Sequence, residues 1–301
     1  MGMPTAPAML PRAATRLDAP DDASGTARRR GAGLHGLAVA DVDRAGRLAA
    51  MRTGELGSVH SWELVTAVDG PGTRLTLFLN GCPLRCLYCQ NPDTLAMKDG
   101  VPVRADAVLE RIRRYLGVFR ATGGGLTISG GEALMQPAFV ARILRGAKEL
   151  GVHTALDTSG YLGAHASDAL LADTDLVLLD VKSGDEDVYR RVTGRDLEPT
   201  LTFGERLARR DDITMWVRFV LVPGLTDGVE NVARVAEYAA SLNAIRPGAV
   251  ARVEVLPFHQ MGRDKWRALG RDYALETTES PTPELLARVR AAFRTAGLTT
   301  F

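Results

Sequence analysis

Short apolar runs alternate with helix-length amphipathic segments from residue 58 to the end of the chain. Five of the six runs are rich in leucine or β-branched residues and carry few charges, which is typical of strands covered on both faces. We expect strands at residues 74–80, 126–129, 152–157, 176–181, 213–222 and 253–258. This pattern predicts a parallel sheet.

The segments between these strands have the length and the apolar periodicity of helices. We expect helices at residues 105–119, 137–150, 164–172, 200–209, 229–242 and 283–296. Strands that alternate with helices through right-handed crossovers build an α/β fold. Six such units rather than eight predict an open partial (β/α)6 TIM-like barrel. No long linker interrupts residues 98–301, and we expect one domain over residues 58–301.

Residues 1–57 have a different composition from the rest of the chain. They are rich in Ala, Gly, Arg and Asp, contain no aromatic residue, and carry an arginine run at residues 28–30. Such a segment has few side chains that could offset its ordering entropy by burial. We therefore expect a disordered or dispensable N-terminal extension, with Met51 as an alternative start. A binding arm or a targeting piece is the alternative.

The charge balance argues against nucleic acid and membrane partners. Lys and Arg total 37 against 36 for Asp and Glu, so the net charge of +1 gives no general electrostatic attraction to polyanions. No apolar run approaches the ~20 residues that span a bilayer, and the N-terminus lacks the apolar core of a secretory signal. The sequence therefore predicts a cytoplasmic protein.

All three cysteines, Cys82, Cys86 and Cys89, lie within one eight-residue window directly after the first expected strand. An odd number of thiols so close together makes a poor disulfide framework and favours a metal site. Four thiolates usually close a cubane [4Fe–4S] cluster. With three, one iron lacks a cysteine and can accept a small-molecule ligand. The alternatives are structural cysteines, or a zinc site completed by one of five His.

The CxxxCxxC spacing, with Tyr88 before the last cysteine, resembles the radical S-adenosylmethionine (SAM) superfamily. Three further segments are similar to the pyruvate formate-lyase activases, a family of glycyl-radical enzyme activases: His60-Ser61, residues 68–72 (VDGPG) and residues 88–94 (YCQNPDT). The resemblance covers residues 58–301. It implies a [4Fe–4S] cluster and SAM as cofactors, and a radical SAM oxidoreductase that uses them.

The resemblance also implies roles for individual residues. The cluster ligands are Cys82, Cys86 and Cys89. The SAM-binding residues are Tyr88, Cys89, Gln90, Gly130, Gly131, Glu132, Asp180, Val181, Lys182, Arg218 and His259. A possible monovalent cation is held by Asp157, Thr158 and Asp180, and the substrate peptide is received by Asp69, Gly70, Pro71 and Gly72.

Each of these positions also has a plain structural interpretation. The Gly-Gly pair and residues 69–72 could be turns, and aspartates at strand ends often cap helices. Arg218 could form a buried ion pair, and a lone His259 could lie on the surface. However, the cysteines, Glu132, Asp157, Asp180 and His259 each fall at the carboxyl end of an expected strand. Ligand sites of parallel α/β folds lie at that edge.

In the resembling family, a radical derived from SAM abstracts a hydrogen from a glycine of pyruvate formate-lyase. The resemblance further implies a flavodoxin or ferredoxin-type reductant and a monomeric enzyme. Alternatives are an activase of another glycyl-radical enzyme or a non-catalytic iron–sulfur electron-transfer protein. Residues 91–130 contain no cysteine, which favours the simple pyruvate formate-lyase type over activases with ferredoxin-like insertions. Gln90 departs from the family's His and leaves the adenine contact open.

Overall fold

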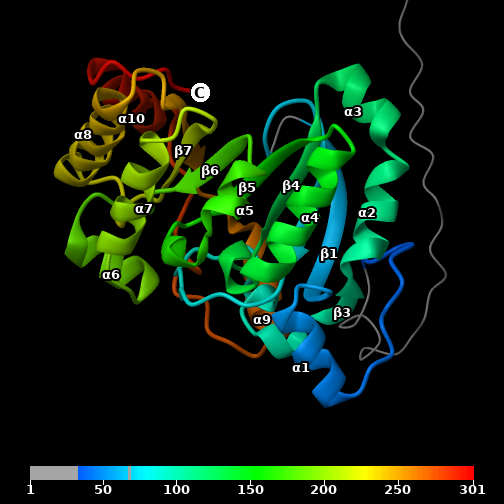
Figure 1. Ribbon diagram of the computed structural model, residues 1–301. Coiled ribbons are helices and arrows are strands. Elements are labelled where there is room, and N and C mark those ends of the chain that lie inside the picture. The colour runs from blue at the N-terminus through cyan, green and yellow to red at the C-terminus, as the bar shows by residue number, and fades with distance from the viewer. Residues whose placement is uncertain (1–32, 67–68) are drawn as a thin grey trace, which may run out of the picture.

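The computed structural model describes residues 33–66 and 69–301, and one sheet with flanking helices forms its centre (Figure 1). The strands are β1 (Leu56–Thr66), β2 (Thr73–Leu79), β3 (Val101–Arg104), β4 (Gly125–Gly130), β5 (His153–Thr158), β6 (Leu176–Asp180), β7 (Thr214–Leu221) and β8 (Val250–Pro257). Their order across the sheet is β3-β1-β2-β4-β5-β6-β7-β8. From β2 to β8, every neighbouring pair is parallel.

This sheet confirms the expected fold class. The six parallel strands overlap the six expected runs, and within the described residues no pairing joins β8 to β3, so the barrel is open. Strands β1 and β3 were not expected. They pair antiparallel at the β2 side of the sheet. No helix within the described ranges is long and apolar enough to cross a membrane.

The helices largely follow the expected positions. They are α1 (Arg44–Arg52), α2 (Ala105–Arg113), α3 (Leu116–Thr122), α4 (Pro137–Glu149), α5 (Asp168–Ala172), α6 (Glu186–Thr193), α7 (Glu198–Ala208), α8 (Val229–Ile245), α9 (Arg263–Ala268) and α10 (Pro283–Thr295). The single helix expected at 105–119 is wrong, because Tyr115 leaves helical geometry and divides it into α2 and α3. Helices α1, α6 and α9 were not expected from the sequence.

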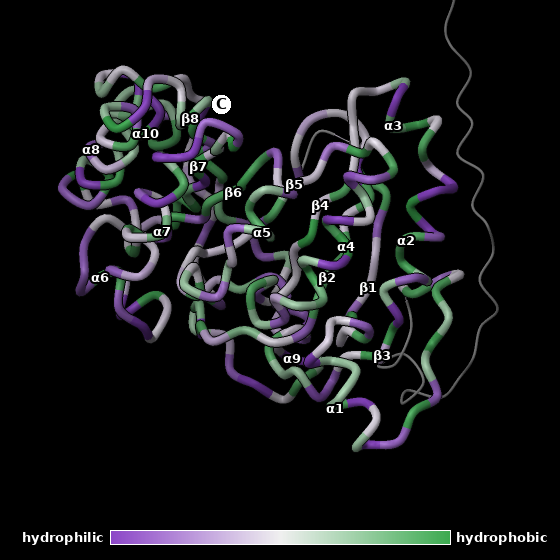
Figure 2. The backbone as a smooth tube through the Cα atoms, in the orientation of Figure 1, coloured by the Kyte–Doolittle hydropathy of each residue, from purple (hydrophilic) through white to green (hydrophobic). Residues whose placement is uncertain are grey.

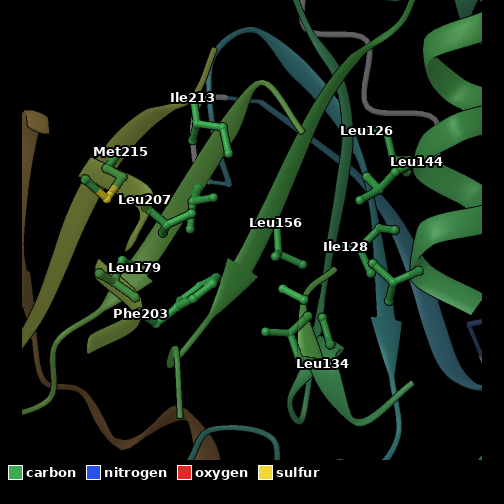
Figure 3. Packing of buried hydrophobic residues seen from close by; sticks show 14 of the residues in the cluster. Leu126, Ile128, Leu134, Leu144, Leu156, Leu179, Phe203, Leu207, Ile213 and Met215 are labelled. Atoms are coloured by element: carbon green, nitrogen blue, oxygen red, sulfur yellow. The ribbon is translucent and has the colours of Figure 1, made fainter. Parts of the chain in front are cut away.

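The two faces of the sheet differ in chemistry. Along β7, Met215 and Val217 are buried, whereas Trp216 and Arg218 on the opposite face are only partly so. The buried face packs on the helices, and Figure 3 shows Ile128 and Leu144 among the side chains that fill this layer. Figure 2 shows that hydrophobic residues recur in the central strands and in the helices beside them. The other face, which we call the inner face, carries polar and charged side chains and is available for ligands.

The expectation of a disordered extension is wrong for residues 33–57. Leu34 and Leu37 are buried in the main core, and His35 accepts hydrogen bonds from Trp62 and Arg111 through its carbonyl oxygen. The apolar residues of this segment are too sparse to form a core of their own, and Leu34 and Leu37 instead join the core of the sheet, whereas Val39 and Leu48 are exposed. Strand β1 begins at Leu56, so a domain boundary at residue 58 would divide a strand. Residues 1–32, with the arginine run, lie outside the described residues.

We predict that a chain beginning at Ser58 is less stable than one beginning at Gly33. Loss of the buried Leu34 and Leu37 alone removes about 3–6 kcal/mol of hydrophobic stabilisation, at roughly 1.5–3 kcal/mol for each fully buried side chain. Denaturant unfolding of the two shortened chains measures the difference. Equal unfolding midpoints would show that residues 33–57 contribute nothing to the fold.

Candidate active site

The cysteine loop, residues 81–95, leaves the carboxyl end of β2 and closes on itself. The Gly81 N–H donates to the carbonyl oxygen of Thr94 at 2.7 Å, and the Cys82 N–H donates to that of Leu95 at 3.2 Å. The three cysteines are free and partly buried. The sequence therefore folds the whole motif into one compact loop at the edge where the parallel strands end.

Two helices brace this loop from different sides. The last residues of α6 accept hydrogen bonds from the loop backbone, from Arg85 N to Thr193 O at 2.8 Å and from Leu87 N to Val192 O at 3.0 Å. From α9, the Trp266 indole donates to the carbonyl oxygen of Cys89 at 2.8 Å. The backbone that positions the thiols is thus fixed from outside the loop.

The thiols have environments that favour their neutral form when no metal is bound. Burial raises the pKa of Cys86 to about 12, against the charge of Lys182, which lowers it. Burial also raises the pKa values of Cys82 and Cys89 above those of ordinary thiols. Metal ligation requires thiolates and releases these protons. The binding of iron must therefore supply the free energy of deprotonation.

The three cysteines fit a cubane cluster better than a single ion. Within residues 33–66 and 69–301, no three His, Cys, Asp or Glu side chains are arranged to hold one metal ion. A cubane cluster binds each cysteine to a separate iron, so its ligands need not converge on one point. The donor set is all sulfur, which is the usual protein ligation of [4Fe–4S] clusters.

The Gly-Gly-Glu turn at the end of β4 has a clear structural reason. A Cβ on Gly130 would lie 2.2 Å from the backbone of Leu79, and one on Gly131 would lie 2.6 Å from the carbonyl oxygen of Gly81. Only glycine permits this close approach of β4 to the cysteine loop. The turn therefore lies against β2 and the cysteine loop, where the Gly131 N–H donates to the carbonyl oxygen of Leu79 and the Glu132 N–H donates to that of Gly81, both at 2.8 Å.

Glu132 is buried and accepts four hydrogen bonds from the protein itself. The family resemblance assigns this residue to SAM binding. Oε1 accepts from Thr158 Oγ1 at 2.6 Å and from Leu134 N at 3.1 Å. Oε2 accepts from Ser159 Oγ at 2.6 Å and from Ser159 N at 3.0 Å. These bonds tie the ends of β4 and β5 together, so Glu132 holds the local backbone in place.

Arg218 is the centre of a charge cluster on the inner face. Its guanidinium lies 3.2 Å from Asp157, 3.6 Å from Glu254 and 4.0 Å from Asp180. Burial alone would lower the pKa of Arg218, but these carboxylates and Asp69 raise it above its ordinary value. The structural ion pair considered for Arg218 is therefore present.

Asp157 and Asp180 respond to this environment in opposite directions. Burial raises the pKa of Asp157 although Arg218 opposes the shift, and Ser129 donates a hydrogen bond to it at 2.6 Å. Burial would also raise the pKa of Asp180, but Lys182 and Arg218 overcome it and lower that pKa. Asp180 is thus the more firmly ionised carboxylate of the two.

Lys182 connects the charge cluster to the cysteine loop. Its ammonium lies 2.9 Å from Asp180 and 5.8 Å from the ring centre of Tyr88, within the range of a cation–π contact. Val181, between the two charged residues, is fully buried, and its N–H donates to the carbonyl oxygen of Arg218. The end of β6 therefore presents one cation and one anion beneath the cysteine loop.

His259 follows β8 and meets Gln90 of the cysteine loop. Gln90 Nε2 donates a hydrogen bond to His259 Nε2 at 2.9 Å. The residue that departs from the family pattern thus contacts another candidate cofactor residue. The cysteine loop, the Gly-Gly-Glu turn, Asp180 with Lys182, and His259 lie at the carboxyl ends of β2, β4, β6 and β8, whereas Arg218 lies within β7.

Residues 69–72 lie between β1 and β2, at the opposite end of β2 from the cysteines. The Asp69 carboxylate accepts from Thr76 at 3.0 Å, and its carbonyl oxygen accepts from Thr127 at 2.7 Å. The side chain of Asp69 therefore reaches the inner face, although its backbone is not at the carboxyl-end edge. Val68, the first residue of the motif, lies outside the described residues.

Other polar residues support the site and were not singled out from the sequence. Glu254 is a further carboxylate near Arg218. It alternates with hydrophobic residues along β8, and this pattern could have indicated from the sequence that it faces the ligand side of the sheet. Asp93 in the cysteine loop binds His60 of β1 at 3.0 Å and Lys265 of α9 at 3.4 Å. The His60 motif and the cysteine motif are thus joined through a hydrogen bond between His60 and Asp93.

Comparisons with known proteins agree with this geometry. Residues 76–236 match the family model described as the radical SAM superfamily. The chain is 36% identical over 244 residues to the pyruvate formate-lyase 1-activating enzyme of Escherichia coli strain K12, covering 80% of this chain and 97% of that relative. It is 40% identical over 232 residues to the pyruvate formate-lyase-activating enzyme of Clostridium pasteurianum, covering 76% and 93%.

Among solved structures, a radical SAM methyltransferase from Sphaerobacter thermophilus superposes with a TM-score of 0.54 at 15% identity, covering 86% of this chain and 81% of that one. At this identity the likeness shows the fold. The alignments with the two sequence relatives cover 97% and 93% of the length of those proteins. The chain therefore belongs to the radical SAM superfamily, and within it to the pyruvate formate-lyase activating enzymes.

Proposed function

We propose that this chain cleaves SAM reductively and uses the resulting radical to abstract a hydrogen from a glycine of pyruvate formate-lyase. The observation that carries the proposal is the placement of three cysteines in one braced loop above the charged inner face. When bound, the reduced cluster would supply one electron to SAM, and cleavage of the C–S bond of SAM would release methionine and a 5′-deoxyadenosyl radical. The hydrogen taken from glycine converts this radical to 5′-deoxyadenosine.

The cluster would be held by Cys82, Cys86 and Cys89, and one iron would remain free for the amino and carboxylate groups of SAM. The backbone at Gly130 and Gly131 lies beside the cysteine loop and offers polar groups to the methionine part. At the end of β6, Lys182 is suited to a carboxylate and Asp180 to a ribose hydroxyl, since one donates and the other accepts.

The remaining assignments follow from position. Tyr88 and Gln90 belong to the loop itself, and Gln90 with His259 would face the adenosine part. Arg218 is already paired with carboxylates, so its role would be to fix the charge of the inner face next to SAM. Glu132 would act through the backbone that it positions.

The monovalent cation stays a prediction. Thr158 donates its hydroxyl to Glu132, while Asp157 and Asp180 both have cationic side-chain neighbours. These contacts supply no separate argument for a cation at the three residues.

The substrate would be a polypeptide segment that enters the open barrel. An acceptor-only Asp69 carboxylate on the inner face suits backbone N–H groups or an arginine of that segment. We propose pyruvate formate-lyase as the protein substrate, a flavodoxin or ferredoxin-type protein as the reductant, and a cytoplasmic monomer as the working form. An activase of another glycyl-radical enzyme is the second candidate.

We predict that Cys86→Ala abolishes SAM cleavage and lowers iron content. The unsubstituted protein should bind about four irons after anaerobic reconstitution, and removing one of three thiolates leaves too few ligands. Iron analysis and 5′-deoxyadenosine formation measure the two effects, and circular dichroism checks the fold. Full cleavage in the variant, or stoichiometric zinc in the unsubstituted protein, would contradict the cluster assignment.

We also predict that a short peptide carrying the target glycine of pyruvate formate-lyase stimulates 5′-deoxyadenosine formation. The same peptide with valine at that position should not, because the branched side chain blocks approach to the Cα hydrogen. Asp69→Asn should raise the peptide concentration needed for half-maximal stimulation by about 10-fold, equivalent to ~1.4 kcal/mol. The affinity for SAM should change less.

The matched control for this experiment is Asp211→Asn, an exposed aspartate that precedes β7. It should respond to the peptide like the unsubstituted protein. If both peptides fail to stimulate cleavage while a small molecule does, the activase function is wrong, although the superfamily assignment stands.

A further inference from the structure

Three exposed arginines lie in the cysteine loop or beside it in the chain segment that braces it. Arg85 belongs to the loop, Arg191 to the last turn of α6, and Arg195 follows that helix. Within the described part of the chain, none of the three has a carboxylate partner. We call these three residues the arginine face.

The lack of partners is not general for this region. The adjacent Arg190 on α6 lies 2.9 Å from Glu186, 3.7 Å from Asp187 and 2.9 Å from Asp196, so its charge is neutralised within the molecule. With Arg190 and these three carboxylates counted, the arginine face leaves this surface with an excess of one positive charge. Such a group attracts an acidic partner and orients its approach.

Two members of the arginine face are attached directly to the cysteine loop. Arg85 Nη1 donates to the carbonyl oxygens of Cys82 and Leu84, both at 2.7 Å. Arg195 Nε donates to the carbonyl oxygen of Pro83 at 3.0 Å. A protein bound to these guanidinium groups would be separated from the Cys82 backbone by one side chain and one hydrogen bond.

The third member does not touch the loop. Arg191 reaches the carbonyl oxygen of Leu225 at 3.4 Å. It lies four residues before Arg195, and α6 is joined to the cysteine loop by the bonds from Arg85 N and Leu87 N. Figure 1 shows α6 on the far side of the molecule from α2 and α3. Arg191 can therefore be altered without removing any contact to the cysteines.

We propose that Arg85, Arg191 and Arg195 form the docking surface for a small acidic one-electron carrier protein that reduces the cluster. The inference rests on the proposed function, because a surface next to the cysteine loop can serve electron transfer only if the loop holds a redox cluster. The step is a single electron transfer: the carrier is oxidised by one electron, the cluster is reduced by one, and no bond forms or breaks.

Reduced flavodoxin, in its hydroquinone form, is the probe for the test. Its second-order rate of cluster reduction is measured by anaerobic stopped-flow absorbance in the reconstituted enzyme. Photoreduced 5-deazariboflavin, a small uncharged reductant, reports on the cluster without requiring the arginine face. The variants are Arg191→Glu and the double variant R191E/R195E. The control, R104E/R114E, makes the same change of net charge at two exposed arginines near α2.

At about 0.01 M ionic strength, where the Debye length is roughly 30 Å, R191E/R195E should slow reduction by flavodoxin by at least about 10-fold. The difference should nearly vanish at about 1 M, where the Debye length is roughly 3 Å. R104E/R114E should change the rate by less than about 2-fold, since these charges lie away from the loop. Reduction by 5-deazariboflavin should be unchanged in all variants.

The proposal is overturned if flavodoxin reduces R191E/R195E and the unsubstituted enzyme at equal rates, or if R104E/R114E has the same effect. It is also overturned if only the activation of intact pyruvate formate-lyase is slowed, because the face would then bind the substrate protein. Should the double variant lose its cluster, Arg191→Glu decides the question, with an expected loss of about 3-fold or more. A failure of the proposed function looks different: 5-deazariboflavin then supports no SAM cleavage in the unsubstituted enzyme.

Discussion

The burial of Arg218 among carboxylates is the constraint on which the site depends. A guanidinium removed from water needs charged partners, and here Asp157, Asp180 and Glu254 come from three different strands. These contacts fix the relative positions of β5, β6, β7 and β8 at the edge where ligands of parallel sheets bind. They also leave Asp180 within 2.9 Å of Lys182, and the ammonium of Lys182 in turn contacts the ring of Tyr88 in the cysteine loop.

The cysteine loop adds a second constraint above this charged surface. Its backbone is fixed by α6 and by Trp266 of α9, while the glycines at the end of β4 allow the sheet to approach it closely. The loop therefore has little freedom to adjust when a cluster binds. Three cysteines held in a braced loop above charged side chains suit a cofactor that carries both a carboxylate and a sulfonium, because its polar end can be held while its reactive bond stays near the cluster.

The sequence predicted the parallel part of the fold because buried parallel strands are continuous apolar runs, which are easy to recognise. It did not predict β1, whose outer half is exposed and whose apolar residues are interrupted by His60 and Glu63. Leu34 and Leu37 were overlooked for a related reason, since isolated leucines in a segment rich in Gly and Ala give no periodic signal. Their burial depends on distant partners.

The candidate site was predictable to the extent that it lies at strand ends, as Asp180, Lys182 and His259 do. Contacts between loops were not, and the pairing of Gln90 with His259 could only come from the three-dimensional structure. The same holds for Asp69, whose backbone lies at the other end of β2 although its side chain joins the inner face.

The central claim is that a hydrogen moves from a glycine Cα of the partner protein to the 5′-deoxyadenosyl radical. The most direct measurement uses pyruvate formate-lyase labelled with α-deuterated glycine, incubated anaerobically with this protein, SAM and a reductant. The account predicts that 5′-deoxyadenosine gains one deuterium and that a glycyl radical appears by electron paramagnetic resonance in equal amount. Unlabelled 5′-deoxyadenosine, formed without a glycyl radical, would contradict it.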